Sequence, residues 1–480
     1  MNSVDILRDV RSGQRSAVDV LEESLTRIRA SDGRLNAFTE VTAARALGEA
    51  RAIDAQRARG ERLPPLAGLP YAVKNLFDIE GVTTLAGSKI NRSLPPARED
   101  AVLVQRMRAA GAVLVGALNM DEYAYGFTTE NTHYGATRNP HDASRSAGGS
   151  SGGSGAAVAA GQVTVALGSD TNGSIRVPAS LCGVWGLKPT FGRLSRRGSF
   201  PFVHSIDHLG PLADSVEGLA LAYDAMQGPD RDDPGCHALA VQPVAQQVSR
   251  GVQGLRIGRL DGYFDEHATP AARAVSLLAA RTLGAQDEVS WPDAALGRAA
   301  AFIVTASEGG SLHLDNLRTR PEDFEPLSVD RFISGALQPA DWYLKAQRFR
   351  RVYRDRINAL FEHWDVLIAP ATPIPALTLG TEWVDIGGVR YPSRPAVGLL
   401  TQPISFAGCP VVAAPMWPDG TDGLPIGVQL ISAPWREDLA LRAAMALQQA
   451  GIAHLVLSPT RTPEGTLSGD PATPSESERE

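Results

Sequence analysis

The sequence predicts an α/β fold in which helices alternate with the strands of a buried, largely parallel or mixed sheet. Continuous apolar runs of strand length, separated by stretches with helical periodicity, indicate this class. These runs lie at residues 69–73, 112–116, 163–167, 366–369, 411–415 and 426–431.

Helical periodicity dominates the N-terminal segment, residues 4–59, where apolar residues recur at spacings of three and four. Ser16 is a candidate N-cap, and Ser31-Asp32-Gly33 is expected to interrupt the helical run. A second amphipathic helix, rich in arginine, is predicted over residues 342–361. Residues 227–254 are rich in Pro, Asp and Gly and predict an exposed loop.

The composition is that of a globular protein with a large core: 480 residues, 43% hydrophobic and 21% charged. A net charge of −7 without a Lys/Arg run gives no indication of nucleic-acid binding, and no apolar run is long enough for a membrane span. The first residues are charged and amphipathic, unlike a signal peptide. Cys182, Cys236 and Cys409 are too far apart for a zinc motif or a disulfide framework. We therefore expect a reduced, soluble, cytoplasmic protein.

Two segments rich in glycine and serine are the candidates for chemistry. One reads RSAGGSSGGSGAAVAAG from Arg145, and the other contains Ser174, 24 residues after Ser150, in GSDTNGSIRVPASLCG. A flexible linker is disfavoured because the first segment runs directly into the small-residue helix predicted at 156–160. A phosphate-binding loop is disfavoured because the lysine that would end it is missing.

A Ser-His-Asp hydrolase stays open as an alternative. No GxSxG elbow surrounds Ser174, which disfavours it. The histidines close enough in sequence to be considered are His133, His141, His204 and His208.

The sequence resembles the amidase-signature hydrolases in three ordered motifs: GLPYAVKNLFD around Lys74, GGSSGGS around Ser150 and DTNGSIRVPA around Ser174. The similarity continues to about residue 458. It implies the amidase-signature fold, a central mixed, twisted β-sheet flanked on both sides by α-helices. We expect one domain over residues 1–458, with helices of about residues 1–60 packed on its core. The Pro/Ser/Glu-rich residues 459–480 predict a disordered tail.

The resemblance implies a Ser-Ser-Lys triad and an amidohydrolase acting on linear amides. Ser174 would be the nucleophile, Ser150 a bridging serine after a cis peptide bond from Gly149, and Lys74 the base. A lysine can act as a base only when neutral, so its pKa must fall from about 10.4 to about 7, a change of roughly 4 kcal/mol. Burial can provide this change, and Lys74 ends a predicted buried strand.

The resemblance also implies an oxyanion hole made by backbone N–H groups of Thr171, Asn172, Gly173 and Ser174. Donors of this kind contribute about 3–4 kcal/mol each to transition-state stabilisation. Asn172 departs from the commoner Gly-Gly-Ser form, which a backbone donor tolerates if the local dihedral angles permit. No cofactor and no metal are implied.

Two subgroups of the family bear on the substrate. Residues 120–142 resemble the glutaminase subunits of tRNA-dependent amidotransferases, in which an Asp of a D-I-F-T-x-P segment holds the amino group of glutamine. Gly398 occupies that position here, which weakens the glutaminase interpretation. Residues 170–211 and the segments YDAMQGPDRDDPGC and TQPISFAGCPVV resemble the catalytic subunits of carboxybiuret hydrolases, which act in cyanuric acid (s-triazine) degradation and release ammonia.

A small, planar, anionic acylurea such as carboxybiuret calls for an arginine. Arg331 matches the carboxylate-binding arginine of the glutaminase subunits and is our candidate; the alternative is a solvated charge on a helix. The other functions left open are a glutaminase-type component of an amidotransferase, an allophanate hydrolase, a general amidase and a non-catalytic scaffold protein.

The resemblance to both subgroups implies a protein partner, because each pairs its amidase with a small subunit that wraps it. We expect a small accessory subunit resembling that of tRNA-dependent amidotransferases, in a dimer of heterodimers with two copies of this chain.

Overall fold

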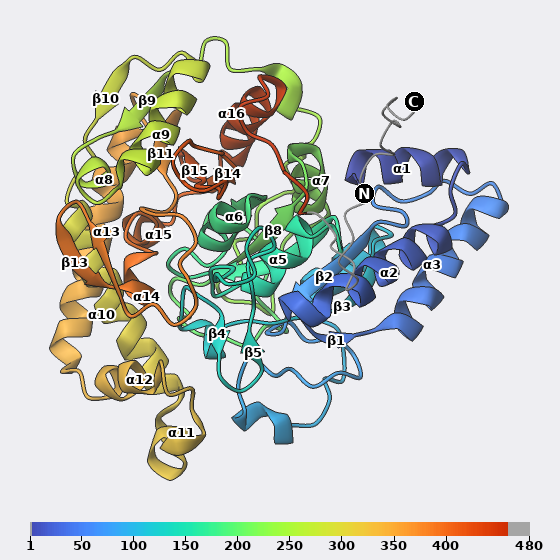
Figure 1. Cartoon of the computed structure of the whole chain (residues 1–480), viewed down its shortest axis with the longest axis horizontal. Helices are drawn as coiled ribbons and strands as arrows, with labels where there is room; N and C mark the ends of the chain where they lie inside the picture. The colour runs from blue at the N-terminus through green and yellow to red at the C-terminus, as the bar shows by residue number, and fades with distance from the viewer. Residues whose placement is uncertain (1, 459–480) are drawn as a thin grey trace, which may run out of the picture.

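The computed structural model describes residues 2–458, so the tail predicted at 459–480 lies outside the described residues (Figure 1). An eleven-stranded sheet runs through the molecule in the order β1-β3-β2-β6-β8-β7-β14-β15-β11-β9-β10. Its strands are β1 (Phe38–Val41), β2 (Pro70–Lys74), β3 (Val113–Leu118), β6 (Val165–Asp170), β7 (Trp185–Lys188), β8 (His208–Ala213), β9 (Ile257–Leu260), β10 (Asp287–Val289), β11 (Val366–Pro370), β14 (Val411–Ala414) and β15 (Val428–Ser432).

The sheet is mixed, as predicted. Strand β2 pairs in parallel with β3 and β6, whereas β6 pairs antiparallel with β8. Every residue of the central strands β2, β3 and β6 is buried. Because successive side chains point to opposite faces, unbroken burial means that both faces of the sheet are covered.

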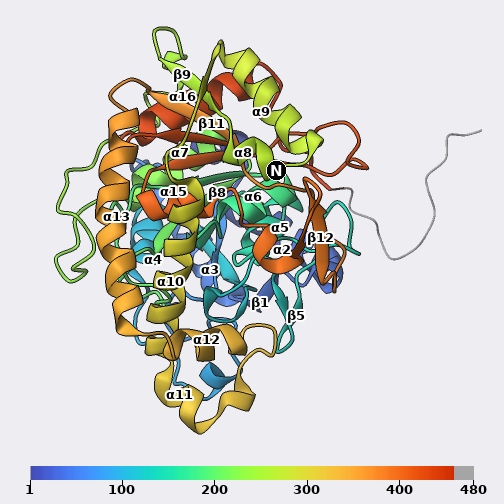
Figure 2. The ribbon, with the colours of Figure 1, turned by 90° about the vertical axis from the view of Figure 1, so that its left-hand side faces the viewer.

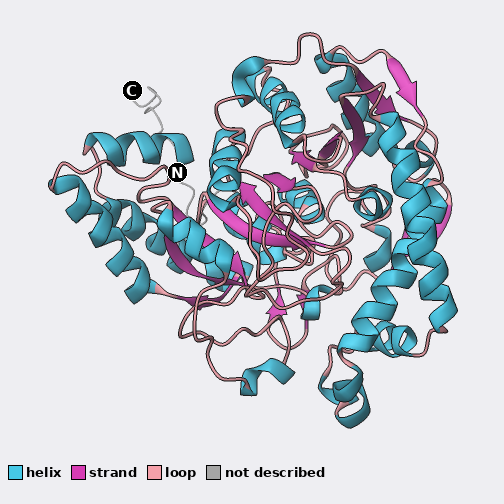
Figure 3. Cartoon of the chain, turned by 180° about the vertical axis from the view of Figure 1, so that it is seen from behind, coloured by secondary structure: helices cyan, strands magenta, loops and turns pink. Residues whose placement is uncertain are grey.

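Helices provide this cover: α1 (Ser3–Ser12), α2 (Ala17–Leu35), α3 (Ala43–Ala58), α4 (Val102–Ala109), α5 (Gly152–Ala159), α6 (Arg176–Cys182), α7 (Val216–Met226), α8 (Tyr263–Glu266), α9 (Pro270–Leu283), α10 (Ala294–Leu312), α11 (Leu314–Thr319), α12 (Val329–Ala336), α13 (Ala340–Leu360), α14 (Ser393–Ala396), α15 (Gln402–Ala407) and α16 (Glu437–Gln449). The long helices α10 and α13 run side by side, and α12 packs on the end of α10 (Figure 2). The same pair flanks the molecule when it is seen from behind (Figure 3).

Two short hairpins lie outside the main sheet. Strands β4 (Glu130–Asn131) and β5 (Gly135–Ala136) form one, and β12 (Trp383–Ile386) and β13 (Val389–Pro392) form the other. Helix α14 follows β13 directly and leads toward α15. No helix of the described residues has the length and apolarity that crossing a membrane requires.

The N-terminal segment differs from the prediction in two places. Ser31-Asp32-Gly33 does not interrupt helix α2, which continues to Leu35. The Ser31 hydroxyl donates to Arg27 O within the helix, and Asp32 accepts from the backbone N–H of Ala37, just beyond its end. The predicted N-cap at Ser16 is confirmed: its side chain and that of Asp19 form a capping box.

The second difference is that the segment 4–59 is not helical throughout. Residues Phe38–Val41 form β1, which pairs antiparallel with β3. A four-residue strand between two long helices is too short to give a period-two signal of its own.

Candidate active site

Lys74 is the last residue of β2, between the parallel strands β3 and β6, and is fully buried. Its Nζ donates to Ser150 Oγ at 2.6 Å and to Ser169 Oγ at 2.8 Å. The first contact is the pair that the resemblance implies. Ser169, near the end of β6, was not among the sequence candidates.

The electrostatic setting of Lys74 favours the neutral amine. Burial lowers the pKa of Lys74 to about 7, against a smaller opposing effect of the carboxylates of Asp121, Asp207 and Asp170. A neutral amine retains a lone pair that can accept a hydroxyl proton from Ser150. The site can therefore supply a base near neutral pH.

Burial alone does not distinguish this lysine. Lys188, at the end of β7, is also fully buried, and burial lowers its pKa to about 7 as well. A buried position with a lowered pKa is therefore shared by two of the lysines. The two differ in their partners, because Lys188 Nζ donates to the backbone carbonyls of Pro189 and Cys409. Contact with a hydroxyl sets Lys74 apart.

Ser150 sits on a loop that glycines allow to pack closely. The Gly149–Ser150 peptide bond is cis, as the resemblance implies. A Cβ on Gly149 would lie 2.1 Å from Asp121 Oδ2, so no larger residue fits there. The backbone N–H of Asp121 donates to Ser150 O, and Thr129 Oγ1 accepts from the next turn at Gly152 N.

Ser174 lies on the loop between β6 and α6. Gly173 has φ +141°, and a Cβ there would lie 2.2 Å from Thr401 Oγ1, so the position requires glycine. Thr401 Oγ1 donates to Asn172 O and fixes this loop. Asn172 has no positive φ and its Nδ2 donates to Thr305 Oγ1, so asparagine is accommodated.

The backbone N–H groups expected to form the oxyanion hole are free. Within residues 2–458, those of Thr171, Asn172, Gly173 and Ser174 find no protein acceptor. The loop also meets the Ser150 loop, because Ser151 N donates to Ser174 O at 3.3 Å. Unpaired donors beside a serine hydroxyl can stabilise a developing oxyanion.

In the described chain, the hydroxyl of Ser174 makes no hydrogen bond to Ser150 or to any histidine. His208 Nδ1 lies 3.0 Å from Asp170 O, and His141 Nε2 lies 2.9 Å from Cys182 O. Because catalytic hydrogen bonds are often long before substrate binds, the missing contact between Ser150 and Ser174 does not exclude a proton relay between them. No contact in the described chain therefore supports the Ser-His-Asp alternative.

A narrow pocket opens beside Ser174. Its volume of about 20 Å³ holds roughly one water, so a substrate must displace side chains to enter. Its walls are formed by Ala124, Tyr125, Gly126, Phe127, Thr171, Asn172, Ser174, Phe202, Phe302, Thr305, Arg331, Pro395 and Gln402. Among these described lining residues, Arg331 is the one charged side chain.

Arg331 lies in this wall and is not a fully solvated helix charge. Its guanidinium stacks on the Tyr125 ring at 4.9 Å, and Nη2 donates to Leu327 O in the turn that precedes α12. Burial lowers the pKa of Arg331, and the positive charge of Arg394 lowers it further. The structure thus brings the candidate anion-binding residue together with Ser174.

Gly398, where the glutaminase subunits carry an acidic residue, faces an aromatic ring. A Cβ on Gly398 would lie 2.5 Å from the ring of Phe127, which also lines the pocket. The ring occupies the space that an acidic side chain would need. A counter-ion for an ammonium group cannot be placed there without moving Phe127.

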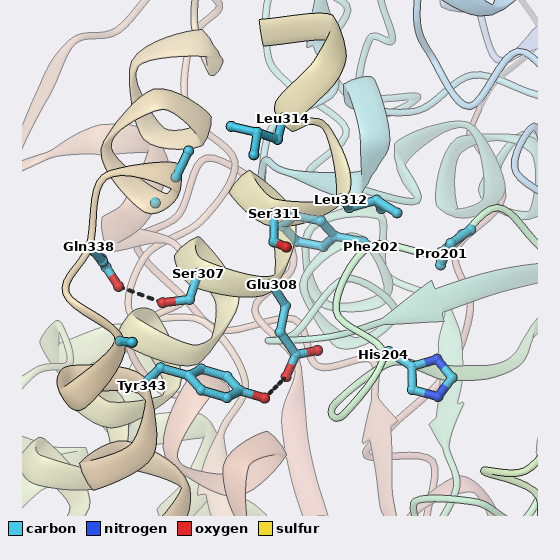
Figure 4. Close-up of a pocket in the computed structure, with 13 residues that line it drawn as sticks. Pro201, Phe202, His204, Ser307, Glu308, Ser311, Leu312, Leu314, Gln338 and Tyr343 are labelled. Atoms are coloured by element: carbon cyan, nitrogen blue, oxygen red, sulfur yellow. Dashed lines mark hydrogen bonds between the residues drawn. The ribbon is translucent and has the colours of Figure 1, made fainter. Parts of the chain in front are cut away.

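A larger hollow of about 650 Å³ lies between α10, α12 and α13 (Figure 4). Tyr343 Oη donates to Glu308, and Ser307 Oγ donates to Gln338 in its wall (Figure 4). Phe202 lines both this hollow and the pocket beside Ser174. Phe202 is therefore a wall residue that the two spaces share.

Comparison with known proteins agrees with this architecture. The family model described as Amidase matches residues 19–441. The chain belongs to the amidase family. Because the match extends over most of its length, the chain is a hydrolase of that family.

Two relatives narrow the comparison to subgroups of the family. It is 73% identical over 455 residues to AtzE, the 1-carboxybiuret hydrolase subunit of Pseudomonas sp. (strain ADP), covering 95% of this chain and all of the relative. It is 39% identical over 464 residues to the A-type subunit of the glutamyl-tRNA(Gln) amidotransferase of Anaeromyxobacter dehalogenans (strain 2CP-C), covering 90% of this chain and 93% of the relative.

A solved structure of similar fold is described as a vestigial protein complex that reveals the evolutionary origins of an s-triazine catabolic enzyme. It matches this amidase with a TM-score of 0.95 and 73% identity, covering 95% of this chain and all of that one.

The amidase also holds a buried ion pair that the sequence reasoning did not single out. Asp170 ends β6, and Arg176 begins α6; their side chains are fully buried and meet at 2.9 Å. Asp170 Oδ2 accepts from Ile175 N, and Arg176 Nη1 donates to Gln429 Oε1 on β15. The Arg176 charge holds the pKa of Asp170 far below its ordinary value, against desolvation. The pair ties the two ends of the Ser174 loop together.

Proposed function

We propose that this amidase hydrolyses a C–N bond of 1-carboxybiuret, a small anionic acylurea, and releases ammonia. The observation that carries the proposal is 73% identity, over 95% of the chain, to AtzE, a 1-carboxybiuret hydrolase subunit. A match of this length extends over the core of the fold and over the segments that line the pocket.

The charge of the pocket supports an anionic substrate. Arg331 is the charged group among its described walls, and a guanidinium binds a carboxylate through two parallel N–H donors. Glutamine would also need an acceptor for its ammonium group, and the Phe127 ring packed on Gly398 leaves no room for one. These contacts favour an acylurea carboxylate over a free amino acid.

The proposed reaction begins with acyl transfer to Ser174. Ser174 Oγ attacks the terminal amide carbon and gives its proton to Ser150, whose own proton passes to Lys74 Nζ, 2.6 Å away. The carbonyl oxygen becomes an oxyanion, which the free N–H groups of residues 171–174 stabilise.

The intermediate then collapses to an acyl-enzyme. The C–N bond breaks, and the leaving nitrogen takes the proton back from Lys74 through Ser150, so that ammonia departs. A water attacks the acyl carbon and loses its proton to the same relay. Ser174 leaves as an alcohol, and the carboxylate product is released.

The proposal includes a protein partner. Among the relatives, AtzE is one subunit of a hydrolase, and the similar solved structure is a protein complex. We infer that a small accessory subunit resembling that of tRNA-dependent amidotransferases binds this amidase, in a dimer of heterodimers. The small protein is expected to wrap the amidase without contributing to the triad.

The triad is tested by substitution and by covalent labelling of the nucleophile. Ser174→Ala, Ser150→Ala and Lys74→Ala should each lower kcat/KM by at least about 1,000-fold with the fold intact by circular dichroism. A fluorophosphonate should label wild-type protein at Ser174, and Ser174→Ala should not be labelled.

Ser307→Ala is the matched control, since Ser307 lines the larger hollow and contacts Gln338. It should hydrolyse and label as the wild type does. Near-normal turnover by Ser174→Ala would overturn the assignment of the nucleophile.

A further inference from the structure

We propose that Arg394 is a specificity-determining residue, which together with Arg331 binds the carboxylate of the acylurea. This inference rests on the proposed function and deepens it. It assigns a second guanidinium group to substrate recognition in a site where the sequence indicated one.

Arg394 is a largely buried cation with unused donors. It lies on α14, directly before Pro395 in the wall of the pocket, and its side chain is 14% exposed. One donor, Nη2, contacts Asp121 Oδ1 at 3.2 Å. Nε and Nη1 are buried and have no hydrogen-bond partner within residues 2–458.

Such unpaired donors are unfavourable. A buried polar group without a partner costs about 1–3 kcal/mol, and more when it is charged. Native proteins keep such groups mainly where a ligand or water completes them. The idle Nη1 of Arg394 can donate to one oxygen of a carboxylate, whereas the idle Nε points to a different side of the guanidinium.

Arg331 approaches the pocket from a different element, α12. Tyr125 supports its guanidinium, and in the described chain no carboxylate forms an ion pair with it. The two arginines are near enough for the charge of Arg394 to lower the pKa of Arg331. Mutual repulsion of two largely buried cations is relieved when an anion lies between them.

Two protein carboxylates lie near this cluster, Asp121 and Glu130. Asp121 is buried, accepts from Thr129 N at 2.9 Å and from Arg394, and its charge also acts on Lys74. Glu130 accepts from the backbone N–H of Gly380 and, within residues 2–458, forms no ion pair with either arginine. The ion pair of Asp121 is with Arg394, so Arg331 is not neutralised by direct contact.

The idle donors of Arg394, with an Arg331 that forms no ion pair within residues 2–458, favour a substrate that carries a carboxylate. In carboxybiuret the carboxylate and the terminal amide lie at opposite ends of a planar chain. When the carboxylate is bound by Arg331 and Arg394, the distal amide carbonyl extends toward Ser174. The same arrangement disfavours neutral amides, which leave the cations unpaired.

The test compares substrate turnover with nucleophile reactivity in Arg394→Met. We expect kcat/KM for 1-carboxybiuret to fall roughly 10- to 100-fold, mainly through KM, because charged hydrogen bonds are lost. The rate of fluorophosphonate labelling at Ser174 should fall less than about threefold, because that reaction needs no carboxylate.

Arg390→Met is the matched control. Arg390 is exposed on β13, the strand that precedes α14, and stacks on Trp383 at 5.0 Å; it is not among the residues that line the pocket. It should retain wild-type values in both assays. Arg394→Lys should recover part of the loss, because it restores a charge but not the fork.

The outcomes separate the inference from the proposed function. An unchanged KM in Arg394→Met, or equal losses of labelling and turnover, would overturn the inference, since equal losses mean that Arg394 acts only through Asp121 on the Ser150 loop. A wild-type protein that labels at Ser174 but releases no ammonia from 1-carboxybiuret would overturn the proposed function instead.

Discussion

At the scale of single residues, two lysines with the same burial have different uses. Lys74 and Lys188 are both fully enclosed, and burial lowers the pKa of each to about 7. Lys188 donates to backbone carbonyls, which carry no proton that a base could take, whereas Lys74 contacts the hydroxyls of Ser150 and Ser169. The partner, not the burial, gives a lysine its role as a base.

The pH dependence follows from this pKa. In the proposed mechanism the neutral form of Lys74 is the active one, so kcat/KM should increase about tenfold per pH unit below a pH of about 7 and level off above it. Lys188→Met should keep this midpoint. Steady-state ammonia release between pH 5 and 9 measures the pH profiles of the wild type and of this variant. A rate that is flat across that range would contradict Lys74 as the base.

The sequence located some of these residues and missed others for physical reasons. Lys74, Ser150 and Ser174 stand in distinctive motifs. Ser169 and Arg394 do not: the first becomes visible only when β2 and β6 pair, and the second is one of many arginines in a chain with only four lysines. A contact made by folding leaves no local signal.

At the scale of elements, the site depends on loops held between strand ends and helix starts. The loop with Ser174 runs from β6 to α6, and its ends are joined by the ion pair of Asp170 and Arg176. Thr401, at the start of α15, holds the middle of the same loop through Asn172 O. The rigidity of the oxyanion donors therefore comes from contacts on three elements.

Removing one partner of the buried ion pair should strongly destabilise the fold. Arg176→Met leaves the Asp170 carboxylate buried without its cation, and we expect the free energy of unfolding to fall by about 3–5 kcal/mol. Denaturant titration measures this free energy of unfolding. Asp170→Asn/Arg176→Met should recover part of the loss; a single variant within about 1 kcal/mol of wild type would refute this role.

The elements that the sequence predicted incorrectly share a cause. Strand β1 and the uninterrupted helix α2 are decided by partners elsewhere, since β1 exists through its pairing with β3. The strands β2, β6 and β11 were predicted correctly within one to three residues because each contains a continuous apolar run.

At the scale of the whole molecule, one eleven-stranded sheet carries both halves of the site. Lys74 lies at the end of β2, while Thr401 and Arg394 come from the segment between β11 and β14. The site is assembled from residues more than 300 positions apart, from Lys74 to Thr401. Such a site forms only when the sheet is complete.

Assembly can be measured at this scale. Co-expression with a small accessory protein of the amidotransferase type should give a complex whose mass by light scattering corresponds to two copies of each chain. The activity per amidase chain should be highest in that complex. An amidase that is monomeric and fully active alone would contradict the inferred partner.

The most direct test of the central claim is ammonia release by the wild-type complex from a substrate panel of 1-carboxybiuret, allophanate, glutamine and simple aliphatic amides. We predict that kcat/KM for 1-carboxybiuret is the highest of the panel and exceeds that for the neutral aliphatic amides by at least about 100-fold, in keeping with a bound carboxylate worth roughly 3 kcal/mol. A preference for glutamine or for a neutral amide would contradict it.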